Sequence, residues 1–150
     1  MPTIFIDADA CPVKDEVYRV ARRLAVPVIV VANTPLRVPV DPLITLVVQP
    51  GFGVVDDWIA ETCGPRSIVI TADIPLAARA LLRGASVLDP RGNAFTESGI
   101  GEALATRELM GELRLTGEVT GGPRPLVPRD RSRFLSKLDE MIHVIRRRKE

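Results

Sequence analysis

Five short apolar runs, rich in Val and Ile, constrain the fold of this chain more than any other feature. They are continuous rather than alternating with polar residues, which is typical of parallel strands covered on both faces. The expected strands are Thr3–Ile6, Val28–Ala32, Ile44–Val48, Ser67–Thr71 and Ala85–Leu88. Residues at helical spacing lie between several of these runs. The sequence therefore predicts an α/β fold with an open parallel sheet flanked by helices.

Helical patterns fill most of the remaining chain. Three apolar faces run from Val13 to Leu24, from Val55 to Thr62 and from Leu76 to Leu81. After Leu88 only helices are expected, one over residues 97–115 and a last one from about Asp130 to residue 147. Residues 117–133 are rich in Gly and Pro and are expected to form an exposed loop. A chain of 150 residues suits one domain spanning residues 1–150.

The composition and the N-terminal residues indicate in which cellular compartment the protein functions and whether it has a membrane partner. No apolar run approaches the about 20 residues that a membrane helix needs. Asp7 and Asp9 lie where a secretory signal would carry basic and apolar residues. The two cysteines, Cys11 and Cys63, are too few for a disulfide framework or a zinc cage. We therefore expect a cytoplasmic protein with no membrane partner.

Acidic or amide side chains follow the ends of four expected strands. In parallel α/β sheets, ligands bind outside these carboxyl ends. Carboxylates brought together there repel one another, and such a group persists best around a cation. Oxygen ligands without His or Cys favour Mg²⁺ or Mn²⁺. The predicted metal ligands are Asp7, Asp9, Asp56, Asp57 and Asp73, with Asn33 beside them.

Each carboxylate also has a structural explanation. Asp9 could stabilise the N-terminus of the helix that follows it, and Asp73, which precedes Ile74-Pro75, could cap another. Asp56 flanks the apolar face of its helix, whereas Asp57 points further away and is the solvated alternative. Asp7 is hardest to explain in this way because it follows a strand that looks buried.

Several other chemistries are excluded by the motifs. Neither GxxxxGK[ST] nor GxGxxG occurs, so a bound nucleotide cofactor is not supported. A phosphatase-type Cys loop would need an Arg six positions after Cys11, where the chain has Val17. The Asp-x-Asp pair is also found in haloacid-dehalogenase-type phosphatases. Their order of motifs differs, because here Asp56 and Asp57 precede Thr71.

Six separated segments resemble the YaiI/YqxD family of bacterial proteins. They are FIDADACPVKDEVYRVA, VVANTPLRVP, GFGVVDDWI, VITADIPLA, LDPRGNAFT and the stretch from GGPRP to RDRSRFLSKLD. This family is similar to the PIN-like nuclease superfamily. The resemblance implies a three-layer sandwich with a C-terminal helical arm. It also implies that Asp7, Asp56 and Asp73 hold Mg²⁺ or Mn²⁺, with Asp9 as an added member. Gly53 stands where relatives are expected to carry another Asp, so this site would have one negative charge fewer than theirs.

The leading hypothesis is metal-dependent hydrolysis of a phosphodiester, on RNA rather than DNA. Asp7, Asp56 and Asp73 would hold the ion, and Asp9 would orient the attacking water as a base. Residues 107–150 hold eleven Lys and Arg against seven Asp and Glu, which suits a surface for phosphates. The predicted substrate contacts are Lys14, Asn33, Arg37, Thr71, Arg124, Arg129, Arg131 and Arg133.

Two alternatives remain open. The C-terminal arginines could instead clamp their loop onto the surface of the domain itself. The whole domain could be a non-catalytic module that binds metal or nucleic acid, because a reduced carboxylate set, as Gly53 suggests, is typical of degenerate nuclease folds.

Overall fold

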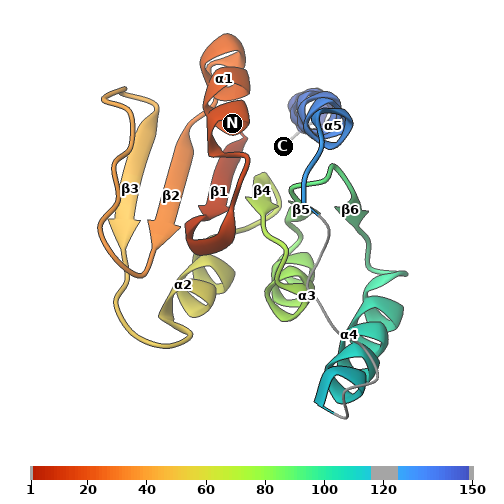
Figure 1. Ribbon diagram of the computed structural model, residues 1–150. Coiled ribbons are helices and arrows are strands. Elements are labelled where there is room, and N and C mark those ends of the chain that lie inside the picture. The colour runs from red at the N-terminus through yellow and green to blue at the C-terminus, as the bar shows by residue number, and fades with distance from the viewer. Residues whose placement is uncertain (1, 116–124, 149–150) are drawn as a thin grey trace.

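The computed structural model describes residues 2–115 and 125–148, which form one α/β unit (Figure 1). Its elements follow one another in a mostly alternating order. They are β1 (Thr3–Asp7), the 3-10 helix η1 (Ala8–Ala10), α1 (Lys14–Leu24), β2 (Val28–Ala32), β3 (Ile44–Val48), α2 (Val54–Thr62), β4 (Ser67–Ile70), α3 (Ile74–Leu82), β5 (Ser86–Leu88), β6 (Ala94–Phe95), α4 (Ile100–Leu115) and α5 (Pro128–Arg147). All five expected strands and the three expected helices between them are present.

The sheet has the order β3-β2-β1-β4-β5-β6. The first five strands are parallel, and β1 lies between β2 and β4, with Ile6 level with Val30 and Ile70. The sequence switches from one side of β1 to the other after β3, so the carboxyl ends of β1 and β4 are neighbours. Ligands of open α/β sheets bind at such a switch point.

The expectation that only helices follow Leu88 is wrong. β6 pairs antiparallel with β5, with Val87 opposite Phe95. A tight turn joins the two strands: the Asp89 carboxylate accepts from the backbone N–H groups of Arg91 and Asn93, and Gly92 has a φ of +88°. Two residues are too few to show a strand periodicity, which is why only the turn residues could have indicated this hairpin.

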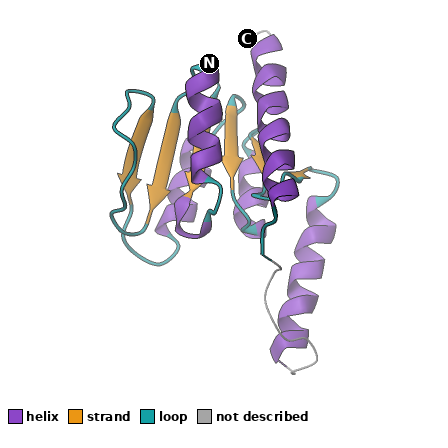
Figure 2. Cartoon of the chain, turned by 45° about the horizontal axis from the view of Figure 1, so that its top comes forward, coloured by secondary structure: helices purple, strands orange, loops and turns teal. Residues whose placement is uncertain are grey.

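Helices cover both faces of the sheet, which confirms the three-layer sandwich (Figure 2). Alternate side chains of β1 point to opposite faces. Ile4 and Ile6 pack in the core beneath α1 and α5, whereas Phe5 packs in the core beneath α2 and α3. The α4 helix packs against α3 and projects beyond the sheet (Figure 1).

The last helix begins at Pro128, two residues before its expected start. Its N-terminus is fixed by Asp130, whose buried carboxylate accepts from the backbone N–H of Val127 and from Arg91 on the β5–β6 turn. Residues 128–133 are therefore helical and not part of an exposed loop. None of the described helices is long and apolar enough to cross a membrane.

The α5 helix lies parallel to α1 and is tied to it along its length. Arg131 donates to the Glu16 carboxylate (Nη1–Oε1 3.0 Å) and to the carbonyl of Pro12. Arg23 pairs with Asp139 (Nη2–Oδ2 2.7 Å) about two turns further along the two helices, and Arg146 donates to the carbonyl of Leu24. Apolar residues of α5, such as Phe134, are buried between these contacts.

Candidate functional site

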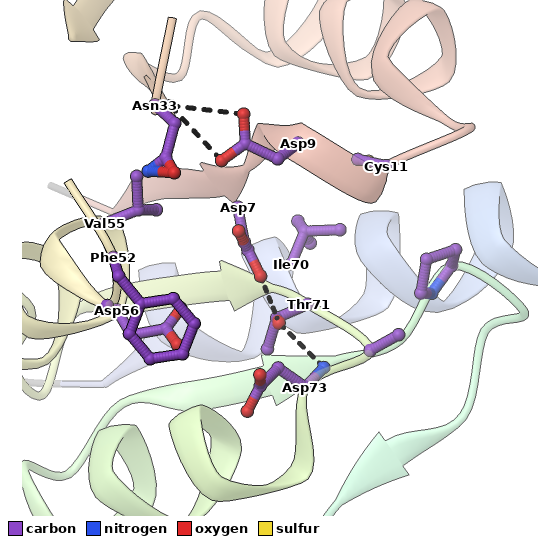
Figure 3. A pocket seen from close by; sticks show the side chains of 13 residues that line it. Asp7, Asp9, Cys11, Asn33, Phe52, Val55, Asp56, Ile70, Thr71 and Asp73 are labelled. Carbon is purple, nitrogen blue, oxygen red and sulfur yellow. Dashed lines mark hydrogen bonds between the residues drawn. The ribbon is translucent and has the colours of Figure 1, made fainter. Parts of the chain in front are cut away.

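A cleft of about 410 Å³ opens at the carboxyl ends of β1 and β4, between the N-termini of α2 and α3 (Figure 3). Its lining includes four of the five predicted carboxylates and both predicted polar neighbours: Asp7, Asp9, Asp56, Asp73, Asn33 and Thr71. Segments that are far apart in the sequence thus meet at one edge of the sheet, as the strand ends indicate. No Lys or Arg is among the described residues that line the cleft.

Asp7 is the last residue of β1 and is half-buried. The hydroxyl of Thr71 donates to its carboxylate (Oγ1–Oδ2 2.8 Å), and the same hydroxyl accepts from the backbone N–H of Asp73 (3.0 Å). Burial raises the pKa of Asp7, the Thr71 hydrogen bond opposes that rise, and the charges of Asp73 and Asp9 add to it. Thr71 thereby fixes the Asp7 carboxylate against the end of β4.

Asp73 has the capping role that its sequence context suggests, and it also faces the cleft. Its carboxylate accepts from the backbone N–H of Leu76 (Oδ1, 2.9 Å), which caps α3, and Pro75 occupies the first turn of that helix. The charge of Asp73 raises the pKa values of both Asp7 and Asp56. Capping and participation in the site are therefore compatible at this position.

Asp56 is the most perturbed carboxylate of the cleft. Burial raises its pKa to about 6, with further contributions from the charges of Asp73 and Asp7 and an opposing one from Arg79. No hydrogen-bond donor among the described residues reaches its side chain. A partly buried carboxylate that lacks a hydrogen-bond donor and lies in the same cleft as two others would be stabilised in its charged form by a bound cation.

Asp9 is exposed and turned to one side of the cleft (Figure 3). Both of its oxygens accept from the backbone N–H of Asn33, at 3.1 and 3.2 Å. The Asn33 side chain in turn donates to the carbonyls of Gln49 and Gly51. Asp9 thus anchors the end of β2, and Asn33 anchors the segment between β3 and α2.

Apart from the C-terminal arginines, three predicted site residues lie outside the cleft. Asp57 is exposed and pairs with Arg79 on α3 (Oδ1–Nη1 2.8 Å), because it lies one residue further around α2 than Asp56. Lys14 donates to the carbonyl of Cys11 (3.0 Å) at the start of α1. Arg37 is exposed on the connection between β2 and β3 and does not line the cleft.

The predicted phosphate-binding arginines fall into three groups. Arg124 lies outside the described residues. Arg131 is engaged by Glu16 and Pro12, which is the internal clamp that the sequence left as an alternative. Arg129 and Arg133 are exposed on the first turns of α5. Arg133 lies near the site, since its backbone contacts Gly92 on the turn whose Pro90 lines the cleft.

The fit to a divalent ion is chemical rather than geometric. The donors are carboxylate oxygens, which Mg²⁺ and Mn²⁺ prefer, and Asp56 has no partner among the described residues. As the described side chains stand, however, no three Asp, Glu, His or Cys residues are close enough to hold a metal ion. The carboxylates share the cleft without converging on one point.

Phe52 is a cleft residue that sequence reasoning missed. Its ring lines the cleft and is fully exposed, in the segment Gly51-Phe52-Gly53. Both glycines have positive φ angles, +119° and +73°. An aromatic residue between two glycines, directly before the helix that carries Asp56, was the available signal.

Comparisons with known proteins identify the family. A family model described as "Uncharacterized BCR, YaiI/YqxD family" matches residues 5–144. The UPF0178 protein of Rhodopseudomonas palustris (strain BisB18) is 57% identical over 145 residues, which cover 96% of this chain and 94% of that protein. The UPF0178 protein of Nitrobacter winogradskyi is 59% identical over 145 residues, covering 96% and 92%. No solved structure matches the chain significantly. The chain belongs to the YaiI/YqxD family.

Proposed function

We propose that this member of the YaiI/YqxD family is a divalent-metal-dependent phosphodiesterase that acts on RNA in the cytoplasm. One observation carries the proposal: Asp7, Asp56 and Asp73 come from three distant segments and line one cleft, where the charge of Asp73 helps to raise the pKa values of both Asp7 and Asp56. Burying repelling carboxylates costs stability and is retained where function needs it.

Asp7, Asp56 and Asp73 would hold one or two Mg²⁺ or Mn²⁺ ions. When bound, such an ion supplies a Lewis acid and lowers the pKa of a coordinated water. Thr71 keeps the Asp7 carboxylate in place through its hydroxyl. Asp56, with its pKa of about 6, would release its remaining proton on binding. In the hydrolysis the water oxygen would bond to phosphorus as the bond to the leaving oxygen breaks, and the leaving oxygen would take up a proton that the water gives up.

The role of Asp9 as a base would require its carboxylate to leave the backbone N–H of Asn33. Its present contacts suit a positioning role for the rim of the cleft. Asn33 and Thr71, which also line the cleft, stay proposed substrate contacts.

Phosphate contacts along the RNA are assigned to exposed cations near the cleft. Arg129 and Arg133 on α5 suit this role because both are exposed, and Arg133 also lies against Gly92 on the turn whose Pro90 lines the cleft. Lys14 and Arg37, which do not line the cleft, stay within the proposal, as does Arg124, which lies outside the described residues. Arg131 is withdrawn from it because Glu16 already neutralises its charge.

A cleavage assay on single-stranded RNA tests the proposal, with Mg²⁺, Mn²⁺ or EDTA present. Wild type should cleave only with a divalent ion, and Asp7→Asn should abolish cleavage. Asp57→Asn is the matched control, because Asp57 is the neighbour of Asp56 but lies outside the cleft. Equal cleavage by Asp7→Asn and wild type would exclude this site.

A non-catalytic module that binds nucleic acid or metal is the second candidate. It is favoured by the hydrogen bonds that already occupy Asp9 and Asp73, and by the lack of three converging ligands among the described residues. This candidate predicts RNA binding without cleavage in any divalent ion, and the same affinity for wild type and Asp7→Asn.

A further inference from the structure

Phe52 is exposed to a degree that simple folding does not require. In the described part of the chain, Phe52 and Val40 are the most exposed large apolar side chains. Exposing a full aromatic ring to water forgoes the stabilisation that its burial would give.

The ring is presented by a fixed backbone. The Asn33 side chain donates to the carbonyl of Gly51 at 3.2 Å, and Asp9 holds Asn33 through its backbone N–H. On the other side, a Cβ added at Gly51 would stand 2.9 Å from Cγ2 of Val54, so the segment packs closely against the start of α2. The side chains of Asp9 and Asn33 thereby position the segment that carries Phe52.

The ring also lies beside the proposed reaction centre. Phe52 lines the same cleft as Asp7, Asp56 and Asp73, and in the view of Figure 3 its ring overlaps the Asp56 side chain. A planar group attached to a phosphate at the carboxylates could rest on this ring. Nucleobases have such a face whatever their sequence, but in a duplex both faces are covered by neighbouring base pairs.

We propose that Phe52 is a stacking platform for an unpaired base, which makes single-stranded nucleic acid the ligand of this cleft. The inference rests on the proposed function for the placement of the phosphate. It deepens that function because it specifies the ligand: the cleft would prefer single-stranded to double-stranded nucleic acid, and Phe52 would be the residue that distinguishes the two.

Binding without cleavage tests the inference. The protein is measured with Ca²⁺ in place of Mg²⁺ or Mn²⁺, so that an ion can still bridge the carboxylates and a phosphate, and each oligomer is checked to be intact afterwards. The ligands are a fluorescent single-stranded oligoadenylate, the same oligomer with abasic sites, and a blunt duplex. Base–aromatic stacking predicts that Phe52→Ala weakens binding of the oligoadenylate by about 5- to 150-fold. Phe52→Trp should restore the affinity. Val40→Ala is the matched control, because it removes an equally exposed apolar side chain that does not line the cleft.

The abasic oligomer should bind Phe52→Ala and wild type alike, and the duplex should bind wild type more weakly than the single strand. Equal affinity of Phe52→Ala and wild type for the oligoadenylate would overturn the inference, as would no binding by wild type. A loss of self-association in Phe52→Ala with unchanged affinity would assign the ring to a protein contact and also overturn it. Cleavage has no part in this readout. An inactive protein whose binding depends on Phe52 would contradict only the proposed hydrolysis, and an active one that ignores Phe52 only the stacking.

Discussion

Thr71 joins the two strands that form the base of the cleft. It is buried, and its hydroxyl donates to Asp7 at the end of β1 while accepting from the backbone N–H of Asp73. The proton and one lone pair of this hydroxyl thus connect the Asp7 carboxylate to the backbone of Asp73. A residue of this kind affects both stability and the geometry of the site.

Replacing Thr71 with Val keeps the shape but removes the hydroxyl. The backbone N–H of Asp73 then loses its acceptor and Asp7 its donor, and because both groups are only partly buried, we put the combined cost at about 1–3 kcal/mol. We expect Thr71→Val to lower the free energy of unfolding by about this amount, measured by urea denaturation. Thr71→Ser should lose much less, because it retains the hydroxyl. Equal losses in the two variants would show that the methyl group, not the hydrogen bonds, matters.

The raised pKa of Asp56 predicts how stability changes with pH. The folded-state pKa is about 6, against an ordinary value of 3.8. Between these values the folded protein binds more protons than the unfolded chain, so stability falls as pH rises from about 4 to about 7. Melting temperatures in EDTA should therefore drop across this window, and Asp56→Asn should drop less. Asp57→Asn should follow wild type, and a drop of equal size in Asp56→Asn would place the titration elsewhere.

At the scale of elements, the β5–β6 turn holds the start of α5. Gly92 has a φ of +88°, and a Cβ added there would lie 2.8 Å from the backbone of Arg133 and Phe134. Gly92→Ala combines a left-handed backbone with a clash against main-chain atoms, and should lower the free energy of unfolding by about 2–5 kcal/mol.

Gly53→Ala is the matched control. Gly53 also has a positive φ, but its Cβ would meet open space, so only the backbone penalty of about 1–2 kcal/mol applies. Similar losses in both would mean that α5 yields to the added methyl group.

The pairing of α5 with α1 separates two arginines that sequence reasoning treated as one group. Arg131 is engaged by Glu16, whereas Arg133 is exposed. Arg131→Ala should lower stability by up to about 1 kcal/mol, since the pair is partly exposed, and should leave the salt dependence of RNA binding unchanged. Arg133→Ala should keep the stability and reduce the slope of log affinity against log salt by about 0.7. The reverse pattern would return Arg131 to the binding surface.

At the scale of the whole molecule, the sequence predicted the parts of the fold that depend on repeated patterns. Continuous Val and Ile runs located the five parallel strands, and the strand ends then brought Asp7, Asp56 and Asp73 to one edge. Features that depend on a single contact between distant residues could not be predicted from the sequence. The Asp9–Asn33 hydrogen bonds, the Arg131–Glu16 pair and β6 each need the three-dimensional arrangement, because no local pattern names the partner.

Stability of the whole chain in the presence of a divalent ion gives the last prediction. An ion that binds only the folded protein stabilises it by mass action, by about 2.7 kcal/mol at a hundred times its Kd. For a chain of this length that corresponds to a rise in Tm of roughly 5–10 °C. Wild type should show this rise with Mg²⁺ or Mn²⁺, most strongly above pH 6, where Asp56 is ionised and repulsion in the cleft is greatest.

Asp7→Asn should melt at a higher temperature than wild type in EDTA, because a repelling charge is gone, and should gain less from the ion. Asp57→Asn should gain as much as wild type. A rise that is equal in all three proteins would mean that the ion binds outside the cleft, and a lower Tm for Asp7→Asn in EDTA would make its carboxylate a structural group.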